Sequence, residues 1–418
     1  MTLNIENIRR QFPALSITDN GVPRIYFDNP AGTQVPQSVI DSMTNCLISA
    51  NANLGGYFKT SVAADRLMDE AHAAAATFLG AKSAREIIFG QNSTSLTLHI
   101  SRSIARTLSA GDEIVLSRMD HDCNVAPWLM IAKDTGATVR WLELDTDDFT
   151  LQTDSLETVI SEKTKLVAVG YSSNVLGTIN DVKAITQHAH SVGALVFIDA
   201  VQLAPHRLID VQDLGCDFLI CSPYKFYGPH QGILWGKEEL LRDLIAYRVR
   251  PAGEALPSKF ETGTLSHESI AGTHAAIDHI ANLSGLDSVS SSLRDRLIAG
   301  FAVMEEYENA MTLHLINELQ ETEGVTVLGI TNPNRIAERV PTVSFVANSM
   351  TPQDIAKQLA DKNIFVWSGH NYGIEPYRAL SREDEGGVRV GLAHYNTVAE
   401  IDDFIKALRD LLDQPNKN

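Results

Sequence analysis

The chain has 418 residues, of which 44% are hydrophobic and 21% are charged, as is ordinary for a soluble globular protein with a large core. Its formal net charge of −18 argues against nucleic acid as a partner, since phosphate backbones need a broad basic surface. No apolar run approaches the roughly 20 residues that a membrane-spanning helix requires, and the N-terminus lacks a signal-peptide core. The cysteines have the spacing of neither a zinc site nor a disulfide framework, so we expect a reducing, cytoplasmic setting, with no membrane and no metal. They are Cys46, Cys123, Cys216 and Cys221.

Apolar runs and helical patterns divide the chain into three parts, for which we predict the boundaries 1–22, 23–285 and 286–418. The first is an amphipathic segment with a turn, and the second opens with a short strand and a Gly/Pro loop. From residue 86 onward strands and helices alternate, which is typical of an α/β fold, a mostly parallel sheet with helices on both faces. The third part begins with a long helical stretch and reads as a smaller α/β domain. Strands are predicted at 86–89, 113–117, 138–143, 164–169, 194–198, 218–221 and 232–236, then at 325–328, 342–346, 364–367 and 387–392.

Polar residues follow several of these strands at their carboxyl ends, where open α/β sheets bind ligands. Residues 90–95 lead into a helical pattern over 96–108. The free N–H groups of a helix N-terminus suit a phosphate, although an ordinary serine or threonine cap is the commoner role. His121 and Asn174 each follow a strand, and alone they would be a surface histidine and a turn-forming asparagine.

Two consecutive predicted strands end in residues of opposite charge. Asp199 follows the run 194–198, and Lys225 follows the run 218–221 after a Ser-Pro-Tyr turn. A strand-end aspartate more often caps the next turn, and a lone lysine is usually solvated, but the pair is more specific than either residue. A lysine amine can form a Schiff base with the aldehyde of pyridoxal 5′-phosphate (PLP), and a carboxylate can pair with the pyridine nitrogen of that cofactor. We therefore expect PLP chemistry at these strand ends.

Five stretches carry a resemblance to one enzyme family, and they occur in the order found there. They are 119–128 (MDHDCNVAPW), 173–180 (SNVLGTIN), 199–202 (DAVQ), 222–229 (SPYKFYGP) and 260–264 (FETGT). In them the chain resembles the class V aminotransferase family of fold-type I PLP-dependent enzymes, and within it the cysteine desulfurase and selenocysteine lyase branch. The resemblance implies a large PLP-binding domain, a smaller C-terminal α/β domain and a small amino acid as substrate. A loop similar to 28–33 lies near the substrate site in that family.

The resemblance also implies roles for single residues. Lys225 would form the Schiff base and remove the substrate's α-proton, Asp199 would pair with the pyridine nitrogen, and His121 would stack on the ring and move protons. Arg389 would bind the substrate α-carboxylate, although a strand arginine without context is usually solvated. Thr264 would reach the cofactor phosphate of the neighbouring subunit, which implies a homodimer. The other implied cofactor contacts are Ser93, Thr94, Asn174, Gln202 and Ser222, and the implied substrate contacts are His370 and Tyr372.

The chain departs from the desulfurase pattern at two positions. Cysteine desulfurases use a mobile cysteine in a loop before the carboxylate-binding arginine. Here Tyr372 stands about where that cysteine should be, and no cysteine follows Cys221. A phenol cannot accept sulfur in this way, which leaves Cys123, in the His121 loop, as an alternative nucleophile. Tyr224 precedes the Schiff-base lysine, where the family usually has histidine.

The sequence therefore predicts a PLP-dependent enzyme that acts on an amino acid and is desulfurase-like, or C–S or selenocysteine lyase-like. An aminotransferase and an epimerase related to isopenicillin N epimerase are alternatives within the family. A non-catalytic relative that keeps the fold as a binding protein is an alternative of another class. Against it stands the joint retention of six residues, Lys225, Asp199, His121, Asn174, Gln202 and Arg389. The sequence leaves open which amino acid is the substrate and which of these reactions follows.

Overall fold

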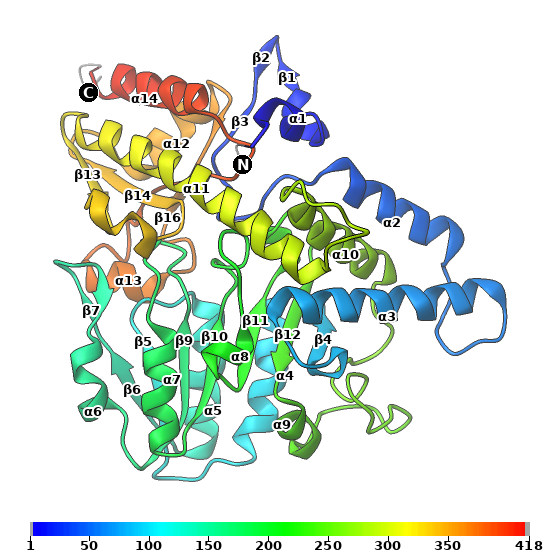
Figure 1. Ribbon diagram of the computed structural model, residues 1–418. Coiled ribbons are helices and arrows are strands. Elements are labelled where there is room, and N and C mark those ends of the chain that lie inside the picture. The colour runs from blue at the N-terminus through cyan, green and yellow to red at the C-terminus, as the bar shows by residue number, and fades with distance from the viewer. Residues whose placement is uncertain (1–2, 414–418) are drawn as a thin grey trace.

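The computed structural model describes residues 3–413 and contains two main sheets, each with its own helices (Figure 1). In Figure 1 the larger sheet lies in the lower part of the molecule, and the C-terminal elements lie above it, close to the N-terminal segment. The larger sheet has seven strands, in the spatial order β4 (Ile87–Gly90), β12 (Gly232–Gly236), β11 (Phe218–Cys221), β10 (Leu195–Asp199), β9 (Thr164–Gly170), β5 (Glu113–Ser117) and β6 (Thr138–Leu142).

The larger sheet is parallel except for β12, which is antiparallel to both of its neighbours. Both faces of the sheet are buried, so its strands appear in the sequence as continuous apolar runs. In β10, for example, Val196 and Ile198 belong to one apolar layer and Phe197 to the other. The predicted mostly parallel sheet is confirmed, and each of its strands lies within one residue of the predicted bounds.

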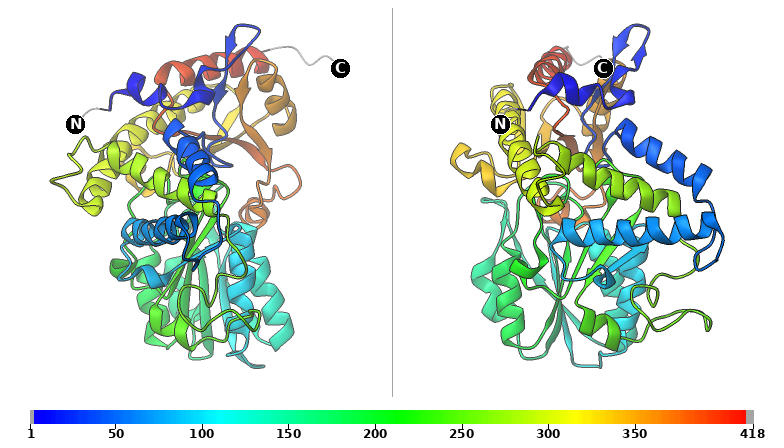
Figure 2. Two further views of the ribbon diagram at one scale, coloured as in Figure 1. Left: turned by 90° about the vertical axis from the view of Figure 1, so that its right-hand side faces the viewer. Right: turned by 45° about the vertical axis from the view of Figure 1, so that its right-hand side comes forward.

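Helices cover both faces of the larger sheet (Figure 2). The helices α3 (Lys59–Leu79), α7 (Val182–Ser191) and α10 (His267–Asn282) contribute to the layer that contains Val196, and α4 (Ser93–Ala105) and α5 (Ala126–Thr135) contribute to the opposite layer. α2 (Gln37–Ser49) packs on α10. Further elements near the larger sheet are short: β7 (Leu144–Asp145), β8 (Thr150–Leu151), α6 (Leu156–Val159), α8 (Val211–Leu214) and α9 (Glu238–Asp243). The short elements α1 (Ile5–Arg9), β1 (Thr18–Asp19) and β2 (Val22–Pro23) lie close to the C-terminal elements in Figure 1.

The smaller sheet is antiparallel throughout. Its strands are β13 (Val325–Leu328), β14 (Thr342–Ala347), β17 (Gly387–Gly391) and β16 (Trp367–Gly369), and its helices are α11 (Leu293–Gln320), α12 (Pro352–Ala360), α13 (Ile374–Ala379) and α14 (Val398–Leu412). α14 begins with a capping box, in which the Thr397 hydroxyl accepts the N–H of Glu400 and the Glu400 carboxylate accepts the N–H of Thr397.

The start of the chain packs against the smaller sheet. The two-residue strand β3 (Ile25–Tyr26) pairs in parallel with β15 (Ile364–Phe365), and Phe27 belongs to the apolar core of the smaller sheet. The strand predicted at 364–367 is therefore split between two partners, since its first half pairs with β3 and its second half starts β16. The division of the chain at residues 22/23 and 285/286 stays a prediction.

Arg339 ties the two sheets together. Its side chain is 1% exposed, and its guanidinium donates to the backbone oxygen of Leu176 (3.3 Å), in the loop after β9, and to those of Thr342 (2.6 Å) and Ile330, beside the smaller sheet. The close approach requires Gly177, because a Cβ there would lie 2.5 Å from the Thr342 oxygen. We refer to this contact between the loop after β9 and the segment before β14 as the Arg339 seam.

Replacing Arg339 with methionine is expected to lower the free energy of unfolding by roughly 3 kcal/mol or more, because several buried carbonyl oxygens lose their donors at once. The urea midpoint, followed by far-UV circular dichroism, measures the change. Arg335→Met is the matched control, since Arg335 pairs at the surface with Asp148 and Glu338, and such pairs contribute about 0–1 kcal/mol. Equal midpoints for the two variants would contradict the stabilising role of the seam.

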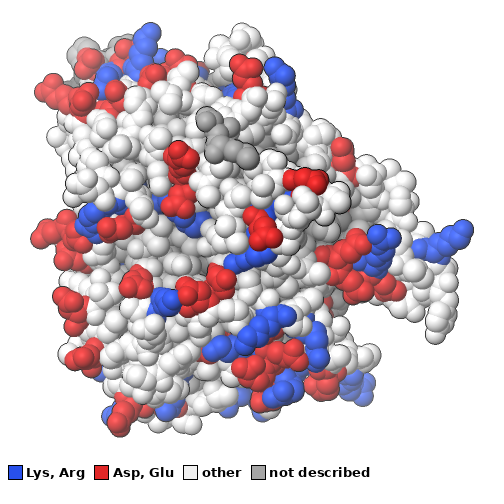
Figure 3. All heavy atoms as spheres, in the orientation of Figure 1, with Lys and Arg blue, Asp and Glu red and all other residues white. Residues whose placement is uncertain are grey.

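Acidic and basic side chains are intermixed over the face of the molecule that Figure 3 shows. Within residues 3–413, none of the helices combines the length and the apolar character needed to cross a membrane. In the same part of the chain, no three or more His, Cys, Asp or Glu side chains come together as a group that could hold a metal ion.

Candidate active site

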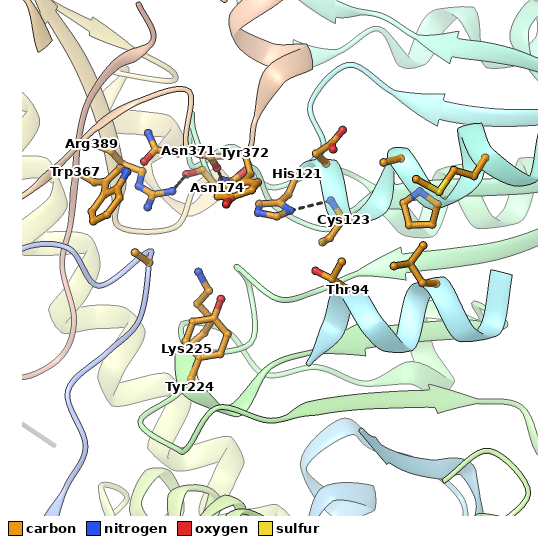
Figure 4. Close-up of a pocket in the computed structure, with 16 residues that line it drawn as sticks. Thr94, His121, Cys123, Asn174, Tyr224, Lys225, Trp367, Asn371, Tyr372 and Arg389 are labelled. Carbon is orange, nitrogen blue, oxygen red and sulfur yellow. Dashed lines mark hydrogen bonds between the residues drawn. The ribbon is translucent and has the colours of Figure 1, made fainter. Parts of the chain in front are cut away.

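Two adjoining cavities lie at the carboxyl ends of β5, β9, β10 and β11, and Figure 4 shows the residues that line the one with Arg389. One has a volume of about 440 Å³, is lined also by Asp199 and Gln202, and is called the Asp199 cavity. The other has a volume of about 530 Å³, is lined also by Trp367, Tyr372 and Arg389, and is called the Arg389 cavity. Small-molecule sites span roughly 300–1,000 Å³, so both volumes are typical. Residues that line both cavities are Thr94, His121, Cys123, Asn174, Tyr224 and Lys225.

Lys225 ends a short 3₁₀ turn (Pro223–Lys225) that directly follows β11, so the strand positions its amine. The side chain is 9% exposed, and Nζ donates to the backbone oxygen of Pro30 in the Gly/Pro loop near the N-terminus. Burial, together with the positive charge of Arg389, lowers the pKa of Lys225 to about 7, against the opposite effect of nearby acidic groups. Near neutral pH a large share of this amine is therefore uncharged, which is the form that attacks an aldehyde.

This lowered pKa predicts the pH dependence of the reaction between Lys225 and an aldehyde. The rate at which the protein reacts with PLP, followed by visible absorbance, is expected to rise through pH 7 and to level off near pH 8, because the amine loses its proton in that range. A lysine at the ordinary pKa of about 10.4 would show its rise some three units higher. A rate that still climbs steeply between pH 9 and 10 would contradict the assignment.

Asp199 is the last residue of β10 and is 6% exposed. Its Oδ1 accepts the backbone N–H of Val201 at 2.8 Å, and its Oδ2 accepts the thiol of Cys123 at 3.3 Å. Burial raises the pKa of Asp199, and these two donors and the charge of Lys225 act in the opposite direction. A carboxylate has about four acceptor sites, so Asp199 can take a further donor from the cavity.

His121 lies in the loop after β5 and forms part of the wall of both cavities. Its Nδ1 accepts the backbone N–H of Cys123 at 3.0 Å, which assigns the ring proton to Nε2. Burial, together with the charges of Lys225 and Arg389, lowers the pKa of His121 to about 3, so the ring is neutral. The ring stacks on Tyr372, with 5.5 Å between the ring centroids. A neutral, oriented imidazole can form one wall of a site for a flat ring.

The N-terminus of α4 lies at the edge of the Asp199 cavity. The helix begins at Ser93, three residues earlier than predicted, because the Asn92 side chain accepts the N–H of Ser95 at 2.8 Å and caps the first turn. Gly232 on β12 permits this position, since a Cβ there would lie 2.5 Å from the carbonyl carbon of Asn92. The first-turn N–H groups and the Thr94 hydroxyl form a setting that suits an anion.

Arg389 enters the site from β17 of the smaller sheet. Its guanidinium is 4% exposed, donates to the backbone oxygen of Asn174 at 3.1 Å, and lies 3.8 Å from the Asp28 carboxylate. Its Nε has no hydrogen-bond partner among residues 3–413. Burial lowers the pKa of Arg389, and burial raises that of Asp28 to about 6, although the charge of Arg389 limits this rise. The guanidinium keeps donors for a second carboxylate.

The loop that carries Tyr372 has a strained tip held by the larger sheet. Asn371 and Tyr372 have φ angles of +52° and +57°, which is unusual for residues other than glycine. The backbone oxygen of Asn371 accepts the Asn174 amide at 2.8 Å, and that of Tyr372 accepts the N–H of Asp122 at 2.8 Å. Strained backbone of this kind is concentrated at functional sites, where the surroundings hold it in place.

The structure brings most of the predicted site residues together. The amide of Gln202 donates to the Thr342 hydroxyl at 2.9 Å, and its oxygen is buried without a partner among the described residues, as is the side-chain oxygen of Asn174. Around the Asp199 cavity are Ser93, Thr94, His121, Asn174, Asp199, Gln202 and Lys225, and around the Arg389 cavity are Arg389 and Tyr372. In Figure 4, Lys225 and Tyr224 lie on one side of the cavity, and Arg389, Asn174 and Tyr372 lie on the other.

Three predicted residues lie outside the lining of these two cavities. Ser222 is fully buried. Thr264 is exposed and lines a separate cavity of about 430 Å³ beside α4. His370 is exposed, and its Nδ1 accepts the N–H of Tyr372 at 3.1 Å. The roles implied for these three residues stay predictions.

Sequence reasoning missed Asp28, Asn371 and Trp367. The Gly/Pro loop that Asp28 opens was expected near the substrate on resemblance, but nothing in the loop singled out its carboxylate. Asn371 and Trp367 flank His370 in the stretch that supplied the predicted substrate contacts. Their position depends on the pairing of β16 with β17, which places Trp367 beside Arg389.

Comparisons with known proteins agree with this geometry. The family model for "Aminotransferase class-V" matches residues 25–404. "Aminotransferase-like protein FGM3" of Gibberella zeae is 34% identical over 421 residues, which cover 98% of this chain and 99% of that protein. A probable cysteine desulfurase of Halalkalibacterium halodurans is 35% identical over 423 residues, which cover 97% of each chain. The apo structure of a cysteine desulfurase from Thermococcus onnurineus NA1 has a TM-score of 0.85 and 27% identity, over 99% of this chain and 98% of that one. The predicted family and fold are thereby confirmed: the chain belongs to the class V aminotransferase family of PLP-dependent enzymes and is similar to its cysteine desulfurases.

Proposed function

We propose that this protein is a PLP-dependent enzyme that acts on an α-amino acid, with chemistry of the cysteine desulfurase or C–S or selenocysteine lyase kind. The observation that carries the proposal is that Lys225, from the larger sheet, and Arg389, from the smaller one, line the same cavity. An amine that reacts with an aldehyde and a guanidinium that pairs with a carboxylate would together serve an α-amino acid substrate. Similarity to cysteine desulfurases over nearly the whole chain supports the class of reaction.

The residues of the Asp199 cavity fit PLP. The first turn of α4, with Ser93 and Thr94, would hold the phosphate, Asp199 would hold the ring nitrogen, and Asn174 would hold the ring oxygen. The unpartnered side-chain oxygens of Asn174 and Gln202 support this fit, since buried polar atoms are costly without a partner and a polar occupant can supply one.

When bound, PLP supplies an aldehyde carbon that reacts with amines and a ring that accepts electrons. The rest of the chemistry is provided by the chain. The amine of Lys225 would hold the aldehyde carbon until a substrate amine replaces it, and would then take the proton from the substrate's α-carbon. Asp199 would keep the ring nitrogen protonated, the neutral ring of His121 would form a wall against the ring, and Arg389 would orient the substrate through its carboxylate.

We favour release of the leaving group over its transfer to a thiol of this chain. Tyr372 occupies the loop that faces the Arg389 cavity, and a phenol cannot carry a persulfide. Cys123 is the thiol that lines the cavities, but burial and the neighbouring Asp199 raise the pKa of this thiol well above its ordinary value. A protonated thiol is a poor nucleophile, which argues against Cys123 as the sulfur acceptor.

The visible spectrum of the PLP-loaded protein tests the proposal while single amino acids are added without a keto acid. We expect a band that is perturbed and then recovers as substrate is consumed, with release of sulfide or selenide from cysteine or selenocysteine. A band that returns only after a keto acid is added would identify an aminotransferase, and recovery with inversion at the α-carbon would identify an epimerase. A protein that takes up PLP but turns nothing over would be the non-catalytic alternative. Failure to take up PLP would overturn the proposal.

We also propose a cytoplasmic homodimer in which Thr264 contacts the partner's cofactor. Supporting this, Thr264 is exposed and lies outside the lining of its own chain's Asp199 cavity. Light scattering gives the oligomeric state. The arrangement would be refuted if the unmodified protein were monomeric and bound PLP, and if Thr264→Val bound PLP with the same affinity.

A further inference from the structure

Cys123 connects the His121 turn to the carboxylate at the end of β10. It lies in a 3₁₀ turn (Asp122–Asn124) and is 7% exposed. Its backbone N–H donates to Nδ1 of His121, the bond drawn in Figure 4, and its Sγ lies 3.3 Å from Oδ2 of Asp199. One residue therefore contacts both groups that would bracket the cofactor ring, the first through its backbone and the second through its side chain.

The carboxylate of Asp199 has a single donor on each oxygen. Oδ1 accepts the N–H of Val201 and Oδ2 accepts the thiol of Cys123. The first donor belongs to the backbone and is the same for any sequence. The second is present only because residue 123 carries an S–H, and alanine there would leave Oδ2 without that donor.

We propose that Cys123 is a positioning residue, whose S–H group stabilises the charged form of Asp199 and so sets how firmly that carboxylate holds the ring nitrogen of the cofactor. This inference rests on the proposed function only in the identity of the ring. A donor to a carboxylate favours its ionised form, and a thiol is a weaker donor than a hydroxyl. As a hydrogen-bond donor the Cys123 thiol must keep its proton, whereas a nucleophilic thiol must lose it.

Other charged and titratable groups also act on Asp199, and the test has to separate their effects. Burial is the main influence that raises the pKa of Asp199, and the positive charge of Lys225 lowers it. Variants confined to residue 123 leave these influences in place, so differences between such variants report the S–H contact alone. The groups that interact with Asp199 electrostatically are Asp120 after β5, Cys221 at the end of β11, and Tyr224 and Lys225 on the following turn.

The first experiment measures binding of pyridoxine 5′-phosphate, which has the ring and phosphate of PLP but no aldehyde, so that titration of Lys225 as a nucleophile does not enter. Its dissociation constant is measured by calorimetry from pH 5 to 8. In Cys123→Ala we expect the acidic limb of the affinity profile to move to higher pH by about half to one unit, because Asp199 becomes easier to protonate. In Cys123→Ser, which restores a donor, we expect the acidic limb of the affinity profile to lie at the same pH as in the parent or at a lower one. Superposed profiles for Cys123→Ala and the parent would overturn the proposal.

Cys46→Ala is the matched control, because Cys46 is also a buried thiol but belongs to a separate apolar cluster with Ala50 and Ala64. Its affinity profile should superpose on that of the parent. A shift of the same size in Cys46→Ala would show that the change in profile is a general effect of losing a buried thiol, and would overturn the assignment to Cys123.

A second experiment needs no cofactor and so distinguishes failure of this inference from failure of the proposed function. Site-resolved alkylation by iodoacetamide at pH 8 should proceed several-fold faster at Cys123 in Asp199→Asn than in the parent, since loss of the carboxylate charge lets the thiol ionise more readily. Cys216 is fully buried and reports unfolding if it is labelled. An unchanged rate at Cys123 in a protein whose Cys216 stays unlabelled would overturn the contact, whether or not the protein binds PLP.

Discussion

Replacing Lys225 with alanine is expected to remove covalently held PLP and to lower turnover of the amino-acid substrate by roughly 10²–10⁴-fold or more, the contribution typical of one positioned proton-transfer group. The effect is large because this lysine would serve twice, as the amine that holds the aldehyde and as the base at the α-carbon. Borohydride reduction of the PLP-loaded parent, followed by peptide mass spectrometry, should find the label on the peptide that contains Lys225. Labelling of another lysine in the parent would contradict the assignment.

The variant should remain folded, which makes the loss of function interpretable. The folded-state pKa of Lys225, about 7, lies below the ordinary lysine value of 10.5, so the folded protein binds fewer protons than the unfolded chain between these values. The buried lysine therefore reduces stability at neutral pH, and its removal should leave the melting temperature unchanged or higher. Lys133→Ala, at an exposed position of α5, is the control that should keep both the label and the activity.

The second large effect is expected for Arg389→Ala, in which the Michaelis constant for the amino acid should rise roughly 10- to 100-fold. A hydrogen bond to a charged group contributes about 1.5–3 kcal/mol, and each 1.4 kcal/mol is a factor of ten. An amine that lacks the α-carboxylate should show no such rise, because it has nothing for the guanidinium to bind. Equal effects on both compounds would mean that Arg389 supports the fold of the site rather than the substrate.

Loss of Arg389 should also change how the Michaelis constant for the amino acid depends on pH. The charge of Arg389 limits the pKa of Asp28, which is raised to about 6 by burial. Without that charge the pKa of Asp28 rises further, so a larger share of Asp28 is protonated at neutral pH. Arg382→Ala is the control, since Arg382 pairs with Glu385 at 3.5 Å on a partly exposed loop and should leave both the Michaelis constant and the profile unchanged.

Local patterns predict where the larger sheet gathers its polar strand-end residues, whereas the roles of His121 and Asn174 are implied by the resemblance alone. His121, Asn174, Asp199 and Lys225 each follow an apolar run, and parallel strands bring their carboxyl ends to one edge of a sheet. Since both faces of this sheet are buried, its strands are unbroken apolar runs that are easy to recognise. The apolar pattern predicts the start of α4 three residues too late, because the helix begins at the side chain of Asn92 and not at a change of that pattern.

The part of the site that the smaller sheet contributes could not be derived from local patterns. Arg389 was assigned by resemblance, since its strand alone would equally suit a solvated arginine. The neighbourhood of Asp28 depends on the pairing of β3 with β15, which joins segments more than 300 residues apart in the chain. Thr264 and His370 lie in loops, whose positions are set by tertiary contacts and not by periodicity.

The Arg339 seam has a consequence for the length of the molecules that the site accepts. Because the seam ties the two sheets together, the amine of Lys225 on one and the guanidinium of Arg389 on the other stand at a set separation. Under the proposed function, an α-amino acid could place its amine at the aldehyde carbon that Lys225 would hold and its carboxylate at Arg389, whereas a β- or γ-amino acid has one or two more carbons between these groups and would leave one of them misplaced. On that function, the seam would limit the number of carbons between the amino and carboxyl groups of the substrate, and Arg339→Met, in which the seam is loosened, should turn over β-amino acids that the parent does not.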